Sequence, residues 1–279
     1  MFFDHLPQQG FICGHRGARS IAPENTLLAM VKARECGAHC WETDVRMSRD
    51  GELIVFHDDT LERTTDIATY AAFQDRVDLH VDRFTLGELR QLDAGSWFLA
   101  ADPFGTVASG EVESGEEKLI RGQKIPLLRE VLDFSREHAF PVNIEIKDLK
   151  TVPGDSLIVD KIIEMLRETD TIDLVLLSSF RHEYLHQVRA LNKDIAIAVL
   201  TRKHHPSDII NYLHGFSASA YHPNVIDISD EKFISRIQRG GFRVNSWTVN
   251  DMEQAPKLLR MGLGVITDWP QRVMCEAYC

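Results

Sequence analysis

The stretch that decides the fold is PVNIEIKDLKTVPGDSLIVDKIIEMLRETDTIDLVLLSSFRHEYLHQVRALNKDIAIAVL, residues 141–200. It contains three short apolar runs rich in Val, Ile and Leu, at 141–147, 173–179 and 195–200. The longer segments between them, 154–168 and 181–191, have apolar residues at helical spacing. This alternation is typical of successive strand–helix units around a parallel sheet, in which both faces of each strand are buried.

The same alternation continues on both sides of this stretch. We predict further strands at 11–17, 39–47, 217–222, 242–249 and 263–268, and further helices at 24–36, 125–138, 206–215, 229–240 and 250–262. Eight strands with helices between them predict a TIM (β/α)8 barrel. A doubly wound open sheet has the same alternation. The barrel is favoured because no GxGxxG or GxxxxGK[ST] loop follows a predicted strand.

The repeat is interrupted after the second strand. GELIVFHDD, residues 51–59, reads as a short extended segment, and an insertion follows at about 58–124. We predict one helix there, at 85–92, and a polar stretch at 103–118. Because the insertion has too few apolar runs for a core of its own, we expect residues 1–279 to form a single domain. It leaves the segment that carries His57, so we expect it to cover or shape the barrel mouth.

Charge and composition limit the partners. A formal net charge of −11 and a pI of about 5.5 argue against a nucleic-acid-binding surface but not against phosphate chemistry at a local site. The chain has no run of about 20 consecutive apolar residues, the length of a membrane span. We therefore expect no stable membrane insertion and a cytoplasmic protein. The cysteines are odd in number, 5, and are expected to be reduced thiols. The sequence leaves the oligomeric state open, and a homo-oligomer is compatible with it.

Acidic residues lie at two predicted strand ends. Residues two apart on a strand point to the same face, so Glu42 and Asp44 project together, as do Glu145 and Lys147. Carboxylates facing a barrel interior need a compensating cation. Because all three proposed ligands are oxygens, Mg²⁺, Ca²⁺ or Mn²⁺ is favoured over zinc. In the alternative, no metal is bound, and the three acids form ion pairs with basic side chains nearby: Arg16, Arg46 and Lys147.

Two histidines end predicted strands on either side of these acids. His15 and His57 each stand where an apolar run gives way to a loop. Histidine titrates near neutral pH, so two of them could remove one proton and donate another during phosphoryl chemistry. Arg16 follows His15, and its planar guanidinium could hold two phosphate oxygens.

Five segments together resemble the glycerophosphodiester phosphodiesterase family. They are HRGARSIAPENTLLAM from residue 15, ETDVRMSRDGELIVFHD from 42, NIEIK from 143, VNSWTVND from 244 and GVITDWP from 264. The resemblance covers nearly the whole chain, and the ordered set is far more specific than any single piece. It implies a TIM barrel that hydrolyses a glycerophosphodiester, a small molecule, to sn-glycerol 3-phosphate and an alcohol.

The resemblance also implies a role for each matching residue. It makes Glu42, Asp44 and Glu145 the ligands of one divalent cation, and His15 and His57 the acid–base pair. It makes Arg16 and Lys147 phosphate-binding residues, and Trp247 the aromatic side chain at the glycerol end, although Trp247 could instead belong to the core. The alternatives for the whole protein are a lysophospholipase D-like phosphodiesterase and a noncatalytic binder of phosphorylated ligands.

Some neighbouring residues have more than one interpretation. Asn25 matches a family position near the site, but a role at the turn before a helix explains it equally well. Asp58 and Asp59 could join the cation, whereas the family pattern uses the histidine before them. Asp268 is interpreted as a helix start before Pro270 and not as a catalyst.

Overall fold

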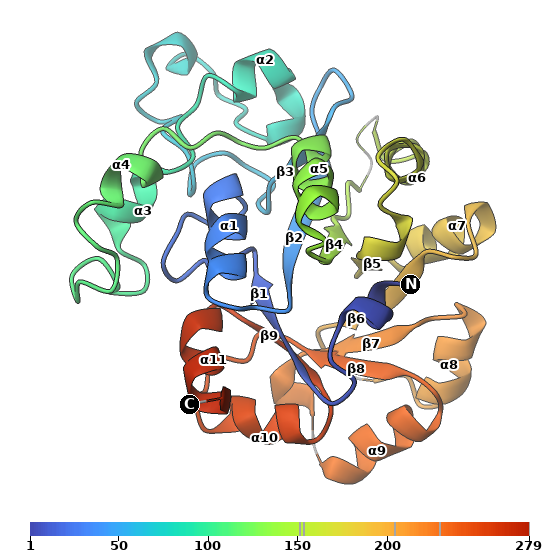
Figure 1. The fold of residues 1–279 in the computed structure, drawn as a ribbon. Helices are drawn as coiled ribbons and strands as arrows, with labels where there is room; N and C mark the ends of the chain where they lie inside the picture. The colour runs from blue at the N-terminus through green and yellow to red at the C-terminus, as the bar shows by residue number, and fades with distance from the viewer. Residues whose placement is uncertain (151, 153, 204, 229, 279) are drawn as a thin grey trace.

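Eight parallel strands close into a barrel in the computed structural model, which describes residues 1–150, 152, 154–203, 205–228 and 230–278 (Figure 1). The barrel strands are β1 (Phe11–His15), β2 (Cys40–Met47), β4 (Val142–Ile146), β5 (Val175–Ser179), β6 (Ala196–Thr201), β7 (Ala220–Pro223), β8 (Arg243–Ser246) and β9 (Gly264–Thr267). Since β1 pairs in parallel with both β2 and β9, the sheet closes. The predicted TIM barrel is confirmed. The short segment β3 (Leu53–Val55) pairs antiparallel with β2, outside the barrel.

Helices follow the strands as the periodicity predicts. They are α1 (Leu27–Glu35), α5 (Leu128–His138), α6 (Ile158–Glu168), α7 (His182–Leu191), α8 (Ile209–Gly215), α9 (Glu231–Arg239), α10 (Gln254–Arg260) and α11 (Pro270–Tyr278). Position 229, the predicted start of one helix, lies outside the described residues. On β2, Trp41 and Val45 belong to the apolar layer shared with the helices, whereas Cys40 belongs to the cluster inside the barrel. Alternation along the strand therefore directs Glu42 and Asp44 into the barrel as well.

The barrel interior changes from apolar to polar along its length. We call its amino-terminal part the floor, a buried cluster made by Phe2, Leu6, Phe11, Cys13, Cys40, Leu176, Ala196, Ala198, Ala220 and Ile266. Phe2 belongs to a short 3-10 helix, η1 (Phe2–His5), which precedes β1 and packs into this cluster. Nearer the carboxyl ends, the imidazole of His222 lies 2.8 Å from the amide nitrogen of Asn245, and both side chains are buried.

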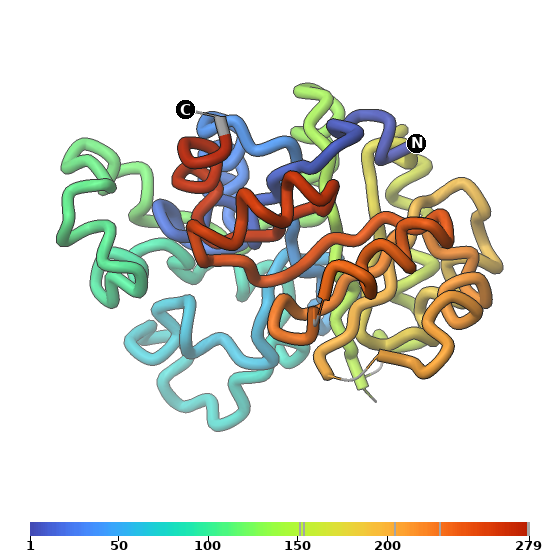
Figure 2. The backbone as a smooth tube through the Cα atoms, turned by 90° about the horizontal axis from the view of Figure 1, so that it is seen from below, coloured from blue at the N-terminus to red at the C-terminus, as the bar shows by residue number. Residues whose placement is uncertain are grey.

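The insertion contributes most residues of two buried apolar clusters. Its short helices are η2 (Ala71–Phe73), η3 (Val81–Arg83), α2 (Leu86–Leu89), α3 (Ser96–Ala101) and α4 (Glu117–Ile120). Figure 2 shows this cyan-to-green segment on one side of the molecule. One buried cluster includes Leu61, Ile67, Phe73, Phe84 and Leu89, and a second is formed by Phe98, Val112 and Ile120. The first cluster also includes Ile54, Phe56 and Ile125, which lie outside the insertion, so the expectation that the insertion has no core of its own stays a prediction. That residues 1–279 form a single domain stays a prediction.

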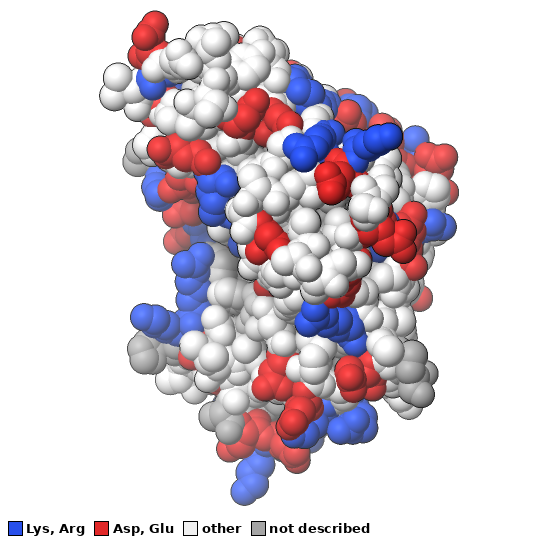
Figure 3. All heavy atoms as spheres, turned by 90° about the vertical axis from the view of Figure 1, so that its left-hand side faces the viewer, with Lys and Arg blue, Asp and Glu red and all other residues white. Residues whose placement is uncertain are grey.

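Other expectations concern the surface and the thiols. On the face drawn in Figure 3, basic and acidic side chains are interspersed. In the described part of the chain, no helix has the length and apolarity needed to cross a bilayer. Cys13, Cys36 and Cys40 are thiols, and Cys279 lies outside the described residues.

Candidate active site

Three carboxylates meet at the carboxyl ends of β2 and β4. Glu42, Asp44 and Glu145 each offer an oxygen, and these oxygens lie within 4.8 Å of one another. Asp44 and Glu145 are direct partners in the parallel pairing of the two strands, which explains their proximity. Among the described residues, this trio is the one group of three or more possible ligands that lie close enough together to hold a metal ion. An all-oxygen set of this kind suits a hard divalent cation.

Basic side chains only partly balance this acidic cluster. The Nζ atom of Lys147 lies 3.0 Å from Asp44 Oδ1 and 2.7 Å from Glu145 Oε1. Arg16 Nε lies 3.4 Å from Asp44 Oδ2, and the Arg16 backbone N–H donates to Glu42 at 3.0 Å. Burial and the two neighbouring carboxylates raise the pKa of Glu42 well above its usual value. The metal-free pairing therefore leaves the buried Glu42 carboxylate poorly compensated, and a cation would stabilise it.

The Asn25 side chain holds one of these carboxylates. Its amide nitrogen donates to Asp44 Oδ2 at 2.8 Å, while its amide oxygen accepts from the Thr43 hydroxyl. Asn25 has a φ of 56°, a left-handed conformation that asparagine tolerates better than most residues. Thr26 caps α1 by accepting from the backbone of Ala29. Asn25 thus stands in the turn before the helix and also contacts the site.

His15 is oriented by an aspartate from the other end of the chain. Its Nδ1 lies 2.6 Å from Asp268 Oδ1, and its Nε2 lies 3.9 Å from Glu42. Burial lowers the pKa of His15 to about 4, even though the Asp268 carboxylate opposes this shift. Burial disfavours ionised Asp268 as well, but His15 and Arg19 lower its pKa to about 2. The interpretation of Asp268 as a helix start is wrong for its side chain: α11 begins at Pro270, and the carboxylate binds His15 instead.

His57 is oriented by its neighbour in the sequence. Its Nδ1 lies 2.6 Å from Asp58 Oδ1. Asp59 turns away to form ion pairs with Arg46, at 2.6 Å, and with Lys150, at 2.9 Å. Asp58 and Asp59 therefore do not join the acidic cluster, and Arg46 does not neutralise it.

Each of the two histidines has an aspartate carboxylate at Nδ1. An ionised carboxylate can only accept hydrogen bonds, so in each neutral ring the proton lies on Nδ1 and Nε2 keeps its lone pair. Asp268 and Asp58 thus play equivalent parts for His15 and His57. Each ring is available at Nε2 for proton transfer.

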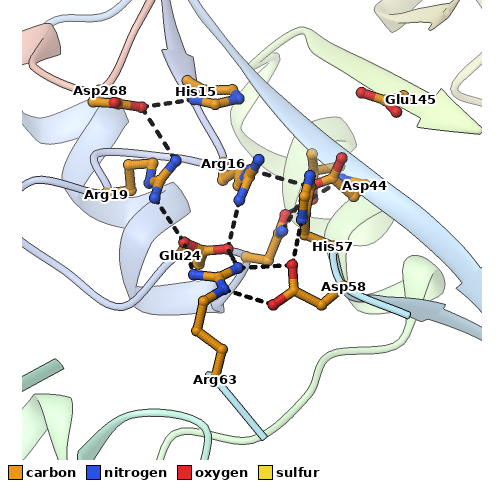
Figure 4. A network of polar contacts seen from close by, with 12 residues as sticks. His15, Arg16, Arg19, Glu24, Asp44, His57, Asp58, Arg63, Glu145 and Asp268 are labelled. Atoms are coloured by element: carbon orange, nitrogen blue, oxygen red, sulfur yellow. Dashed lines mark hydrogen bonds and ion pairs between the residues drawn. The ribbon is translucent and has the colours of Figure 1, made fainter. Parts of the chain in front are cut away.

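A buried glutamate links these two environments (Figure 4). Glu24 lies 2.7 Å from Arg16, 3.0 Å from Arg19 and 2.7 Å from Arg63. Despite burial, the three guanidinium groups hold the pKa of Glu24 well below its usual value. Arg19 also approaches Asp268 at 3.5 Å, and Arg63 binds Asp58 at 2.6 Å.

A hollow of about 550 Å³ opens beside the acidic cluster. His57, Glu145, Lys147, Phe180 and Arg202 are among its lining residues. The Phe180 ring packs edge-on against Trp247, with centroids 5.3 Å apart, and the Arg202 guanidinium lies 4.8 Å from the Phe180 centroid. Trp247 is half-buried, contacts the floor cluster from above, and donates its indole N–H to the His222 carbonyl at 2.9 Å. An aromatic wall therefore adjoins the charged site.

The sequence profile of the Glycerophosphoryl diester phosphodiesterase family matches residues 15–272. The chain belongs to this family. A glycerophosphodiester phosphodiesterase of Caldanaerobacter subterraneus subsp. tengcongensis is 30% identical over 268 residues, which cover 94% of this chain and 96% of the relative. A solved Oleispira antarctica phosphodiesterase, in complex with the product sn-glycerol-3-phosphate, is 30% identical with a TM-score of 0.79, and 98% of each chain is covered. A putative member from Silicibacter pomeroyi has a TM-score of 0.80 at 22% identity, covering 97% of this chain and 94% of its own, and supports the fold alone.

Within this member of the family, the predicted site residues belong to five strands or lie just after them: β1, β2, β3, β4 and β8. These residues are His15, Arg16, Glu42, Asp44, His57, Glu145, Lys147 and Trp247. The sequence interpretation missed the contact of Asp268 with His15 and the contacts of Glu24 with Arg16, Arg19 and Arg63. Asp268 could have been found, because it directly follows β9 and lies two residues beyond the lumen-facing Ile266.

Proposed function

We propose that the protein is a divalent-cation-dependent glycerophosphodiester phosphodiesterase that releases sn-glycerol 3-phosphate and an alcohol. The observation that carries this is the three-carboxylate cluster flanked by two aspartate-bound histidines at the barrel mouth of a family member. The Oleispira relative, solved with sn-glycerol-3-phosphate as its product, supports the identity of the product.

The residues at the mouth divide into groups by chemistry. Glu42, Asp44 and Glu145 would hold Mg²⁺, Ca²⁺ or Mn²⁺, which when bound would supply Lewis-acid stabilisation of charge on the phosphate oxygens. Arg16 and Lys147 border this cluster, where they are placed to bind the phosphate. Trp247, packed on Phe180, offers an apolar wall to the glycerol carbons.

The histidines supply proton transfer. One imidazole removes the proton of the glycerol 2-hydroxyl, whose oxygen attacks phosphorus and forms a cyclic phosphate. The bond from phosphorus to the alcohol oxygen breaks, and the other histidine, protonated at the start, donates its proton to the departing oxygen. Water then opens the ring with the two proton transfers reversed, which gives sn-glycerol 3-phosphate. Asp268 and Asp58 orient the rings and stabilise whichever imidazole is charged.

The test is a substrate panel of glycerophosphocholine, glycerophosphoethanolamine, glycerophosphoinositol and lysophosphatidylcholine. Released sn-glycerol 3-phosphate is measured with a coupled dehydrogenase, before and after a chelator and after each of the three cations is restored. We expect turnover of the glycerophosphodiesters, its loss with chelator and its return with metal. Lysophosphatidic acid from lysophosphatidylcholine alone would indicate a lysophospholipase D, and binding without turnover would indicate a noncatalytic binder.

A further inference from the structure

The insertion reaches the catalytic histidines through Arg63. Its Nε donates to Asp58 Oδ2 at 2.6 Å, and its Nη2 donates to Asp58 Oδ1 at 3.0 Å. This bidentate contact fixes the plane of the carboxylate that binds His57 Nδ1. Asp58 directly follows His57 in a loop, so sequence proximity alone would leave the orientation of its side chain undetermined.

The other edge of the same guanidinium is held just as firmly. Arg63 Nη1 donates to Glu24 Oε2 at 3.0 Å, and Nη2 donates to Glu24 Oε1 at 2.7 Å. With Nε bound to Asp58, contacts to the two carboxylates occupy most of the five N–H donors of the group. On the insertion side, the guanidinium lies 6.0 Å from the Trp97 ring centroid, and Trp97 belongs to α3. Arg63 is thus fixed from three directions.

Glu24 is a suitable anchor because it is fixed to the barrel itself. It is buried in the turn between β1 and α1, and Arg16 and Arg19 also bind it. Arg19 continues the contacts to Asp268, at 3.5 Å, and so to His15. The chain of polar contacts therefore runs from one histidine to the other, and the insertion supplies the link nearest His57.

We propose that Arg63 is a positioning residue for His57, so that the insertion is part of the acid–base apparatus and not only a cover over the mouth. The inference rests on the proposed function, in which His57 transfers a proton. Two other roles for Arg63 are possible in principle: direct phosphate binding, and surface ion pairing without effect on catalysis. Contacts with Asp58 and Glu24 commit its donors away from a phosphate, and a bidentate contact on each edge is unlike a mobile surface pair.

The test is a double-mutant cycle between Arg63→Gln and His57→Ala. We expect Arg63→Gln to lower kcat about 10- to 100-fold, the usual loss for a residue that orients a reacting group, with KM nearly unchanged. Arg63→Lys should recover only part of this loss, because an ammonium cannot bind two carboxylates in bidentate fashion. In the His57→Ala background, Arg63→Gln should cost less than about twofold, since the group that it positions is gone.

Arg76→Gln is the matched control. Arg76 is also an arginine of the insertion with a glutamate partner, Glu88, but it has no contact with Asp58 or Glu24 among the described residues. Its kcat should stay within about twofold of wild type. Circular dichroism and thermal unfolding of each variant check folding, and Arg63→Lys supports the cycle if Arg63→Gln does not fold.

The outcomes separate the inference from the proposed function. Losses that multiply in the double variant, a raised KM with kcat intact, or an Arg63→Gln enzyme as active as wild type would each overturn the positioning role while the function stands. Full turnover by His57→Ala alone would refute the two-histidine mechanism and the inference with it.

Discussion

The mouth and the floor of the barrel are built on the same strands and have opposite chemistry. On β2, Cys40 belongs to the floor, and Glu42 and Asp44, two and four residues further on, belong to the mouth. The floor is apolar and packed, whereas the mouth gathers buried carboxylates, histidines and arginines. Along the inward-facing side of β2, the change from an apolar residue to two acidic residues therefore marks the boundary between the floor and the mouth.

This difference has an energetic side. Burying each large apolar side chain of the floor, such as Phe2 or Leu176, stabilises the fold by about 1.5–3 kcal/mol. Burying charge at the mouth is unfavourable unless every group has a partner. Substitutions should therefore separate the two ends: those at the mouth change turnover, and those at the floor change stability.

The largest loss of turnover is expected at the acidic cluster. Glu42→Gln and Glu145→Gln should each lower kcat/KM by more than about 10²-fold and weaken binding of the added cation, because even partners of metal ligands typically cost 10- to 100-fold. Without metal, urea unfolding of Glu42→Gln should show no loss of stability, because this change removes like-charge repulsion from the cluster. Glu164→Gln, on the exposed side of α6, is the control. Wild-type cation affinity in both site variants would show that the metal site is wrongly assigned.

The next largest effect is expected at the histidines. His15→Ala and His57→Ala should lower kcat about 10²- to 10⁴-fold, the usual contribution of general acid–base catalysis, while cation affinity measured by calorimetry stays near wild type. The variant that lacks the acid should be partly rescued on a p-nitrophenyl ester, whose leaving group needs no proton. His186→Ala, an exposed histidine of α7, is the control. Near-full turnover of glycerophosphocholine by both variants would exclude the two-histidine mechanism.

A floor substitution should reverse this pattern. Phe2→Ala removes a ring that is 1% exposed and should lower the free energy of unfolding by about 3 kcal/mol, because the site cannot fully close over the lost volume. Its kcat should stay within about twofold of wild type at a temperature where the variant is folded. Urea unfolding and initial rates on the same preparation check both. A fall in kcat without a fall in stability would contradict the separation of the two ends.

The smallest effect is expected from His222, which lies between the two ends. Burial lowers the pKa of His222 to about 3, below the usual 6.5. The unfolded chain therefore binds this proton more readily, so stability is full above about pH 6.5 and is lost as the pH falls toward 3. Between pH 7 and pH 5 this contributes a loss of about 2 kcal/mol. Urea unfolding of His222→Gln should show a weaker pH dependence than wild type over this range, and equal slopes would contradict it.

Sequence patterns predicted the features that depend on local periodicity. The alternation of apolar runs located all eight barrel strands, and two-residue spacing predicted that Glu42 projects with Asp44 and Glu145 with Lys147. Contacts between distant loops were not predictable in this way. The partnership of His15 with Asp268 joins residues that only the closure of the barrel brings together.

The buried apolar clusters of the insertion escaped prediction for a different reason. Phe73 ends the three-residue helix η2, Leu89 ends the four-residue helix α2, and Phe84 lies between helices, so none of them belongs to a segment long enough to show a period. The helix predicted at 85–92 extends only over Leu86–Leu89, and Thr85 and Glu88 form a capping box at its start.

The pairing of β1 with β9 has a consequence for biosynthesis. β1 is made before the other barrel strands, and its partner β9, Gly264–Thr267, is made after them. Until then, β1 presents an open edge, and the phenylalanines of η1 cannot be enclosed on all sides. The nascent chain therefore exposes this strand edge and its aromatic neighbours until β9 has been made, and chaperones would bind them during that interval.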